Sequence, residues 1–256
     1  PAVMTFKTGV KKDGSITARQ AHLVYDSGGY AAFKPQRGVT YGSRCLGPYK
    51  IPHGKIDSYV VYTNQVPCGS MRAPGDPQSI FAAETQMDLI ARELGMDPVE
   101  FRRKNLVQDG DLSPLGARWQ NVMGMRTLEA AVTEAGYGDA KPQTPGKVTG
   151  RGMALCERNV GAGSSTAKIS IDSDGTVTLN TALPDTGSGF YTVLRQILGQ
   201  ELGVAYDEIK LEHWSTDDVE FDTGVGGSRV THVAGQAVFR AAQELRQKMV
   251  TMAADL

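Results

Sequence analysis

Three glycine-containing segments, each followed by a predicted helix, hold the residues of this 256-residue sequence that point most directly to chemistry. The segments are 68–75 (CGSMRAPG), 185–189 (DTGSG) and 223–229 (TGVGGSR). Glycine lets backbone amides approach a ligand closely, and the first amides of a helix are unpaired donors at the positive end of its dipole. Arg72 and Arg229 add guanidinium groups, which suit phosphate and oxo ligands. We therefore expect the three segments to converge on one polyanionic ligand.

None of the three segments matches a standard nucleotide-binding or nucleophile motif. Gly224-Val225-Gly226 begins like GxGxxG, but Arg229 stands where the third glycine belongs, and the sequence has no GxxxxGK followed by Ser or Thr. Gly187-Ser188-Gly189 is too short for a Gly-x-Ser-x-Gly elbow. Because loops before helices also contain glycine for conformational reasons alone, spacing leaves a purely structural interpretation open.

The residues that most often bind metals are scattered along the sequence. The histidines are His22, His53, His213 and His232, and the cysteines are Cys45, Cys68 and Cys156. Without CxxC spacing or two histidines one helical turn apart, the sequence predicts neither a metal site nor a disulfide framework. Reduced thiols are typical of a cytoplasmic protein, which is the location we expect, while the roles of the three cysteines stay open.

Six further polar residues have both a functional and a structural interpretation. They are Arg44, Glu84, Asp172, Asp174, Asp217 and Asp218. Glu84 lies at the edge of an apolar helical stripe, where a hydrogen-bonded structural carboxylate is favoured over a functional one. The four aspartates could ligate a metal, but their turn and loop positions favour solvated side chains. Arg44 could pair with an anionic substrate, although a surface arginine in a loop is the more common case.

The charge balance and the apolar runs exclude two classes of partner. The sequence has 27 basic and 28 acidic side chains, a net charge of −1, and no basic stripe, so we expect no nucleic-acid partner. No apolar run approaches the roughly 20 residues that a membrane-spanning helix needs. We therefore expect no membrane span either.

The first half of the sequence predicts a hairpin followed by a strand and helices. The turn is Lys12-Asp13-Gly14-Ser15, in which glycine takes a positive φ. The predicted elements are strands at 16–25 and 56–62 and helices at 78–94, 98–105 and 128–135. Pro77 and Gly95 bound the helix 78–94. Its apolar stripe is formed by Ile80, Phe81, Met87, Ile90, Ala91 and Leu94.

The second half repeats this order, with Asp174-Gly175 as a second hairpin turn. Its predicted elements are strands at 152–157, 166–171, 176–183 and 208–214 and helices at 190–202 and from about 233 onward. Strand pairs mixed with helices predict an α+β fold of two subdomains, each a mixed sheet with packed helices. The proline- and glycine-rich 141–147 is the expected linker between subdomains 1–140 and 148–256. Both ends read as interrupted elements, so we expect a piece of a longer polypeptide.

Several short motifs, in a fixed order, carry a resemblance to a known family. They are 48–52 (PYKIP), 61–64 (VYTN), 71–78 (MRAPGDPQ), 81–84 (FAAE), 97–105 (DPVEFRRKN), 185–189 (DTGSG), 226–229 (GGSR) and 235–238 (GQAV). Together they resemble the molybdenum-binding large subunit of the xanthine dehydrogenase and aldehyde oxidase family, over nearly the whole chain.

The resemblance implies a molybdenum hydroxylase, an oxidoreductase that adds a water-derived oxygen to an activated carbon. Molybdenum would be held by molybdopterin, in bacteria often as the cytosine dinucleotide, although this fragment alone need not bind it. Electrons would leave through an iron–sulfur subunit or domain to an FAD subunit or domain, within a dimer of heterotrimers. The small-molecule substrate stays open between an aldehyde, a purine, an N-heterocycle and an aromatic acyl thioester.

The resemblance also implies roles for residues in the three segments. Arg72 and Ala73 would lie by the oxo and sulfido ligands of molybdenum. Gly187, Ser188 and Gly189 would contact the pterin. Gly226, Gly227, Ser228 and Arg229 would contact the pterin or its pyrophosphate.

The sequence departs from the family pattern in four places. Ser188 replaces the usual glutamine, and Pro74 stands where an aromatic residue is usual. A cofactor-binding glycine–phenylalanine loop would precede Pro1, and the general-base glutamate would follow Leu256. We therefore expect no catalytic residue within 1–256 and no turnover by this chain alone. The alternative is a non-catalytic scaffold or assembly module that keeps the fold without the cofactor.

Overall fold

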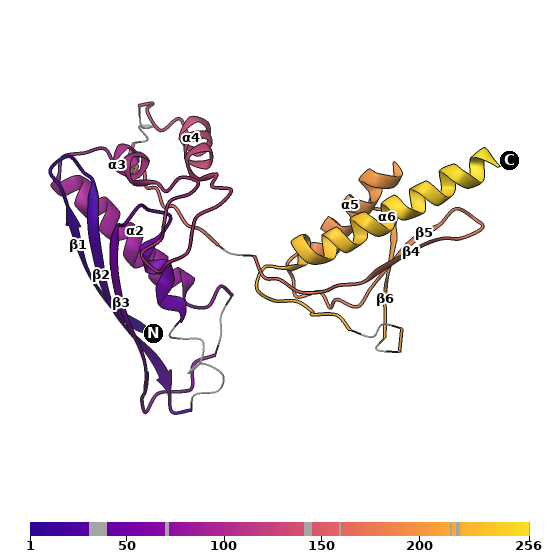
Figure 1. Ribbon diagram of the computed structural model, residues 1–256, viewed down its shortest axis with the longest axis horizontal. Helices are drawn as coiled ribbons and strands as arrows, with labels where there is room; N and C mark the ends of the chain where they lie inside the picture. The colour runs from indigo at the N-terminus through magenta and orange to yellow at the C-terminus, as the bar shows by residue number, and fades with distance from the viewer. Residues whose placement is uncertain are drawn as a thin grey trace. The chain divides into compact units, whose positions relative to one another are not determined.

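The computed structural model describes residues 1–30, 40–69, 72–140, 145–158, 160–215, 217–218 and 221–255, apart from the side chains of Thr40, Tyr41 and Ser43. Residues 141–144 of the predicted linker lie outside this range. The chain forms two compact units, unit 1 (Pro1–Glu157) and unit 2 (Arg158–Leu256), and each has its own sheet and helices (Figure 1). Residues 145–157, most of which follow the predicted linker, belong to unit 1.

Unit 1 is built on a mixed sheet of β1 (Ala2–Val10), β2 (Ile16–Gly28) and β3 (His53–Tyr62). β1 and β2 form the predicted hairpin, and Gly14 in its turn has a φ of 85°. β3 pairs with the other edge of β2 in the parallel direction. One face of β2 is buried, with Leu23 fully enclosed, because side chains alternate between the faces of a strand.

The α-helix α2 (Asp76–Glu93) and the 3-10 helix η1 (Thr40–Leu46) pack against the sheet of unit 1 (Figure 1). The helices α3 (Pro98–Asn105) and α4 (Gly124–Glu134) add further buried side chains to the core, and α3 packs on α2. The larger of the two clusters of buried side chains in unit 1 comprises Ile16, Leu46, Tyr49, Ile51, Met87, Ala91, Val99, Phe101, Leu106 and Leu128. The predicted stripe of α2 is wrong at Phe81, whose side chain is 75% exposed.

The strand predicted at 152–157 is also wrong, because residues 151–158 pair with no strand among the described residues. Side chains bind this segment instead. Arg102 donates to the Met153 carbonyl at 3.1 Å, and the Leu155 amide donates to Glu84 at 2.8 Å. The apolar residues alternate as in a strand, because Met153 and Leu155 both pack on the core. Their backbone groups, however, bond to side chains and not to a neighbouring strand.

Unit 2 repeats the arrangement of a hairpin with a parallel third strand. Its elements are β4 (Ala167–Ile171), β5 (Val177–Thr181), α5 (Phe190–Leu202), β6 (Lys210–His213) and α6 (Val230–Ala254). β4 and β5 are antiparallel, and β6 is parallel to β5 after the crossover through α5. The buried core lies between the sheet and the two helices, with Leu179, Leu194 and Leu198 fully enclosed.

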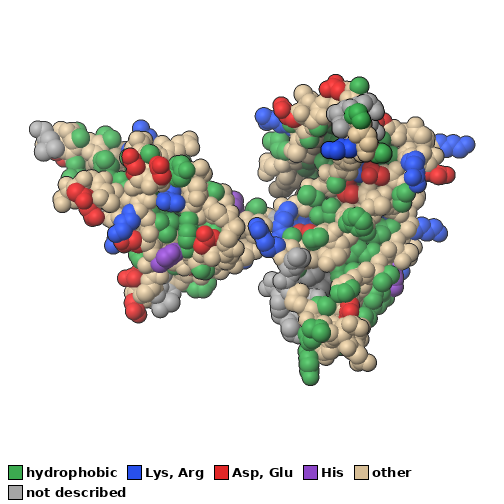
Figure 2. Space-filling model, turned by 180° about the vertical axis from the view of Figure 1, so that it is seen from behind, with side chains coloured by type: hydrophobic (Ala, Val, Ile, Leu, Met, Phe, Trp, Pro, Cys, Tyr) green, Lys and Arg blue, Asp and Glu red, His purple; other side chains and the backbone are tan. Residues whose placement is uncertain are grey.

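The surface mixes both signs of charge. On the face drawn in Figure 2, Lys and Arg side chains alternate with Asp and Glu over both units, and no basic stripe is visible there. Over the described ranges, no helix combines the length and the apolar character needed to span a bilayer.

Candidate functional site

The loop before α5 needs glycine at two positions. Gly187 and Gly189 have φ values of 77° and 74°, and Gly189 is the N-cap of α5. A Cβ on either glycine would meet no atom within 4 Å, so backbone conformation and not crowding requires glycine here. The Gly187 amide donates to Asp185 at 2.8 Å, and the hydroxyls of Thr186 and Ser188 are 3.1 Å apart. Residues 184–189 are exposed.

The loop before α6 pairs with a segment that the sequence analysis did not identify, at 158–165. Five hydrogen bonds join them: Gly161 N to Gly227 O (2.6 Å), Thr223 N to Ser164 O (2.9 Å), Ser164 N to Thr223 Oγ1 (2.7 Å), Ser165 Oγ to Asp222 Oδ2 (2.6 Å) and Arg158 Nε to Ser228 Oγ (3.1 Å). In the sequence, the pair Gly161 and Gly163 is the feature that could have pointed to this segment. The structure explains the first of them, because a Cβ at Gly161 would lie 3.0 Å from the Gly227 carbonyl oxygen.

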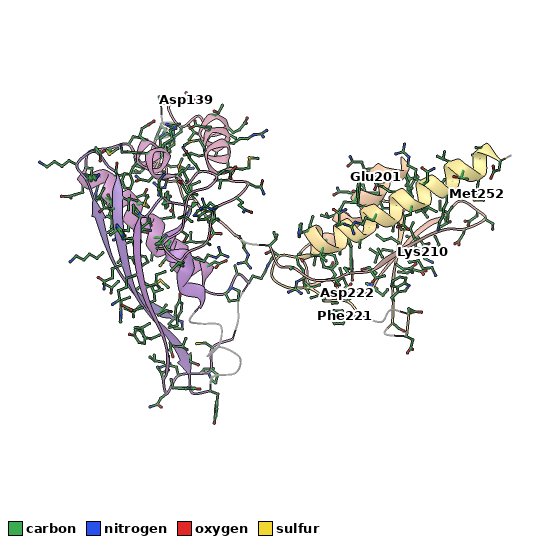
Figure 3. All side chains as sticks on the ribbon, viewed as in Figure 1. Asp139, Glu201, Lys210, Phe221, Asp222 and Met252 are labelled. Carbon is green, nitrogen blue, oxygen red and sulfur yellow. The ribbon has the colours of Figure 1, made fainter. Side chains whose placement is uncertain are left out.

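Arg229 is held against its own loop. Its Nε donates to the Gly226 carbonyl at 2.9 Å and its Nη1 to the Thr223 carbonyl at 3.4 Å. Ser228 beside it has a φ of 60°, which side-chain-bearing residues rarely adopt. The loop begins at Asp222, which Figure 3 labels, and the Asp222 carboxylate accepts the Gly224 amide at 2.7 Å. Arg229 therefore stabilises the loop conformation in this structure.

Leu183, two residues after the end of β5, connects the two loops of unit 2. Leu183, which is 1% exposed, precedes the 185–189 loop and accepts the Tyr191 hydroxyl at 2.8 Å through its carbonyl. The same leucine shares a small void with Asp222, Gly224 and Arg229 of the other loop. Leu183, two residues before the second predicted segment, thus lies beside the third predicted segment in unit 2.

The first predicted segment belongs to unit 1, and Ser70 and Met71 of it lie outside the described residues. Arg72 is exposed. Ala73 has a φ of 54°, an unusual value for a residue with a side chain, and Gly75 has a φ of 82° as the N-cap of α2. Two left-handed residues therefore form the turn that leads from Arg72 into α2.

The three helices behind these loops begin without a side-chain cap. The N-caps of α2, α5 and α6 are Gly75, Gly189 and Arg229, and none accepts a hydrogen bond from the first turn through its side chain. α3 is different, because Asp97 accepts the amides of Val99 and Glu100. α4 also lacks a cap but follows no predicted glycine loop. No side-chain cap therefore competes with an anion for the first amides of α5 and α6, whereas at α2 the Asp76 amide already donates to the Ala73 carbonyl and Pro77 has no N–H.

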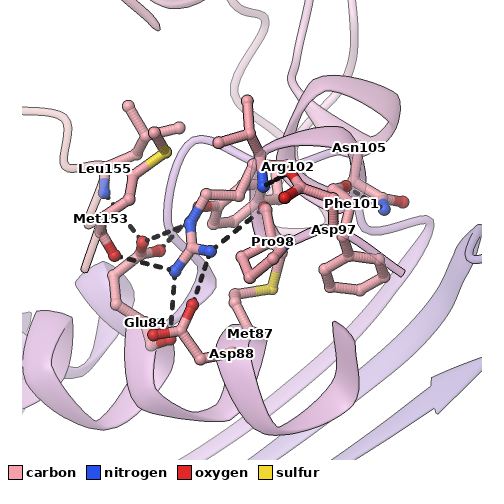
Figure 4. A network of polar contacts seen from close by, with 12 residues as sticks. Glu84, Met87, Asp88, Asp97, Pro98, Phe101, Arg102, Asn105, Met153 and Leu155 are labelled. Atoms are coloured by element: carbon pink, nitrogen blue, oxygen red, sulfur yellow. Dashed lines mark hydrogen bonds and ion pairs between the residues drawn. The ribbon is translucent and has the colours of Figure 1, made fainter. Parts of the chain in front are cut away.

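Glu84 has the structural role that the sequence favoured (Figure 4). Its side chain is almost fully buried and accepts Tyr49 Oη at 2.7 Å, Arg102 Nε at 3.0 Å and Leu155 N at 2.8 Å. Arg102, which is fully buried, also contacts Asp88 at 2.7 Å. Burial opposes the charged form of Arg102, but Glu84, Tyr49 and Asp88 together outweigh this effect and raise the Arg102 pKa. Burial and the Glu84 charge raise the pKa of Tyr49.

The other candidates also have structural surroundings. Arg44 is neither a free surface arginine nor open to a substrate, since it forms ion pairs with Asp76 and Glu157. Asp174 and Asp218 accept turn amides at 3.0 Å, and Asp172 and Asp217 are exposed. Over the described ranges, no three His, Cys, Asp or Glu side chains gather closely enough to hold a metal ion. Cys45, Cys68 and Cys156 are free thiols.

The fold and the loops define a class of protein: two α+β units that present uncapped helix starts behind glycine turns, which suits an anionic cofactor bound through backbone amides. Residues 1–106 and 125–256 each match the family described as molybdopterin cofactor-binding domain, and the chain belongs to this family.

Known relatives and solved structures agree with this family. The chain is 28% identical to the xanthine dehydrogenase molybdenum-binding subunit of Escherichia coli, over 96% of this chain and 34% of the relative. It is 31% identical to the aldehyde oxidoreductase of Megalodesulfovibrio gigas, over 96% of this chain and 28% of the relative. A reconstituted CO dehydrogenase from Oligotropha carboxidovorans has the same fold, with a TM-score of 0.76 at 23% identity, over 99% of this chain and 35% of that one.

These comparisons confirm the family resemblance and the α+β fold that the sequence predicted. The chain spans about a third of the length of the curated relatives that it matches. No comparison tests the individual cofactor-binding residues or the subdomain limits 1–140 and 148–256, so these stay predictions.

Proposed function

We propose that this chain is part of the molybdopterin-binding subunit of a molybdenum hydroxylase, a cytoplasmic oxidoreductase. The observation that carries the proposal is the set of three uncapped helix starts behind glycine turns in a chain of the molybdopterin cofactor-binding family. Backbone amides, two arginines and hydroxyls are the donors that phosphate and oxo groups require, so the residues present fit the cofactor.

Each unit supplies its own part of the cofactor-binding residues. The family resemblance implies that Arg72 and Ala73 in unit 1 would face the oxo end of the cofactor, and Arg72 is exposed at the turn before α2. In unit 2, residues 187–189 and 226–229 would hold the pterin and its phosphates through amides. When bound, the cofactor supplies the oxygen-transfer chemistry, and the residues of this chain bind and orient it.

The cofactor form and the other subunits follow from the family. We propose the cytosine dinucleotide form, an iron–sulfur partner, an FAD partner and a dimer of heterotrimers for the whole protein. The substrate class stays between an aldehyde, a purine, an N-heterocycle and an aromatic acyl thioester. Because the expected general base follows Leu256, residues 1–256 alone would not turn over substrate.

A scaffold without cofactor is the second candidate, and two observations favour it. The Ser188 hydroxyl, which replaces the usual glutamine, lies within hydrogen-bond distance of Thr186. The Arg229 guanidinium binds two carbonyls of its own loop. In a scaffold, these side chains would serve the fold alone.

Metal and nucleotide analysis separates the two candidates. The whole protein that contains residues 1–256 would be isolated from a host that makes the cofactor, its molybdenum counted per chain, and its acid-released nucleotides identified by chromatography. A molybdenum hydroxylase predicts about one molybdenum per chain together with released CMP.

Variants assign the contribution of the loops. Arg72→Ala should lower molybdenum content several-fold. Arg92→Ala should not, because Arg92 is exposed in the last turn of α2, at the other end of the helix that follows Arg72. A folded protein with molybdenum at background level would contradict the hydroxylase proposal and support the scaffold. Equal loss in both variants would remove the specific role of Arg72.

A further inference from the structure

Arg44 joins two parts of unit 1 that are distant in sequence. It lies in η1, and its side chain is only 17% exposed. Its Nε is 3.5 Å from Asp76 Oδ1, and its Nη1 donates to Glu157 Oε1. A guanidinium group can hold two carboxylates through separate N–H groups, whereas an ammonium acts as a compact point charge. Arg44 is therefore suited to bridge these two residues.

One partner of Arg44 anchors the turn that carries Arg72 and Ala73. Asp76 is the first residue of α2, and its side chain is 9% exposed. Its amide donates to the Ala73 carbonyl at 3.0 Å, which closes the turn. Ala73 has a left-handed backbone, and such a conformation persists only where its surroundings hold it. The Arg44–Asp76 ion pair is part of those surroundings.

The other partner of Arg44 is the last residue of unit 1. Glu157 ends the segment that lacks a strand partner and that the side chains of Arg102 and Glu84 bind at residues 153 and 155. Its carboxylate is 24% exposed and pairs with Arg44. The point at which the chain leaves unit 1 is therefore tied, through Arg44, to the start of α2.

We propose that Arg44 is a positioning residue that holds the Arg72–Ala73 turn and the exit of the chain from unit 1 in one fixed relation. This inference rests on the proposed function for its purpose, since the turn carries the unit 1 cofactor residues and the exit leads to the unit that carries the others. Arg44 itself contacts no substrate or cofactor in this role. If Arg44 no longer bridges Asp76 and Glu157, the Arg72–Ala73 turn and the end of unit 1 at Glu157 both become more mobile.

Hydrogen–deuterium exchange of the full chain tests this coupling without any cofactor. Arg44→Met keeps the apolar stem of the side chain and removes both ion pairs. We expect exchange to accelerate about tenfold or more in residues 73–79 and also in residues 151–158, with β1 and β2 unchanged. Arg103→Met is the matched control, because Arg103 pairs with Glu100 and Glu129 and contacts neither place.

Glu157→Gln is the decisive variant in this exchange experiment, because it removes one carboxylate of the Asp76–Arg44–Glu157 bridge with little change of side-chain shape. Exchange should rise at residues 73–79, although the substitution lies outside that segment, and Arg44→Lys should restore only part of the protection. Faster exchange at one place alone, or an unchanged α2 start in Glu157→Gln, would overturn the proposal. If Arg44→Met does not fold, Arg44→Lys and Glu157→Gln still decide it.

Molybdenum content then distinguishes this inference from the proposed function. If the wild-type whole protein binds molybdenum, Arg44→Met should lower its content several-fold and Arg103→Met should not. If the wild-type whole protein holds none, the proposed function fails, while the exchange result still confirms or overturns the bridge.

Discussion

Replacing Glu84 by glutamine tests whether the buried carboxylate organises unit 1. Glutamine has nearly the same shape, so the change removes the charge that faces the fully buried Arg102 and leaves the packing intact. Asp88 then remains as a carboxylate partner of Arg102, but its side chain is 47% exposed and solvent weakens its effect. Breaking a buried ion pair from one side costs about 3–5 kcal/mol.

This loss is large beside the stability of a typical domain, about 5–15 kcal/mol. At about 2–4 °C per kcal/mol for a domain of this size, the melting temperature of unit 1 should fall by about 6–20 °C. Thermal and urea unfolding followed by the fluorescence of Trp119, in a Trp214→Phe background, report on unit 1 alone because the chain has 2 tryptophans.

The matched control is Glu100→Gln, which removes a carboxylate that pairs with Arg103 at the surface. Its side chain is 59% exposed, so the free energy of unfolding should change by about 0.5 kcal/mol or less. If Glu84→Gln also cost less than about 1 kcal/mol, Arg102 would be stabilised by other groups and the reasoning on the buried pair would be refuted.

Two further predictions concern a buried thiol and a crowded glycine. Burial raises the pKa of Cys45 to about 11, so iodoacetamide at pH 8 should modify Cys156 quickly and Cys45 only after unfolding; equal rates would contradict this. The unfolded thiol has a pKa of about 8.5. The stability that this pKa shift contributes is therefore present below that pH and lost as pH rises through 11, and Cys45→Ala should flatten the free energy of unfolding, measured in urea, over this pH range. Gly161→Ala should destabilise unit 2 by about 1–3 kcal/mol in urea unfolding followed by Trp214 fluorescence in a Trp119→Phe background, because the new Cβ would lie 3.0 Å from the Gly227 carbonyl oxygen. Gly226→Ala, whose Cβ would meet only Arg229 Nη2 at 3.9 Å, is the control, and an equal loss in both variants would refute the crowding argument.

Local chemistry in the sequence determined the turns, most helices and the family. Gly14 and Gly175 take positive φ values in the two predicted hairpin turns, and α5 spans 190–202 as predicted, ending at Gly203 with a φ of 75°. These features depend on residues close together in the chain, which is why a sequence pattern can predict them. The ordered motifs identified the family for the same reason, because each motif is a short stretch of neighbouring residues.

Only the tertiary structure decided which distant groups meet. The parallel pairing of β3 with β2, the binding of residues 153 and 155 by Arg102 and Glu84, and the pairing of 158–165 with the loop before α6 all join residues far apart in sequence. Arg44 looked like a loop arginine because its partners, Asp76 and Glu157, lie far along the chain. Hydrogen bonds and ion pairs depend on spatial distance, and the order of residues alone does not contain that distance.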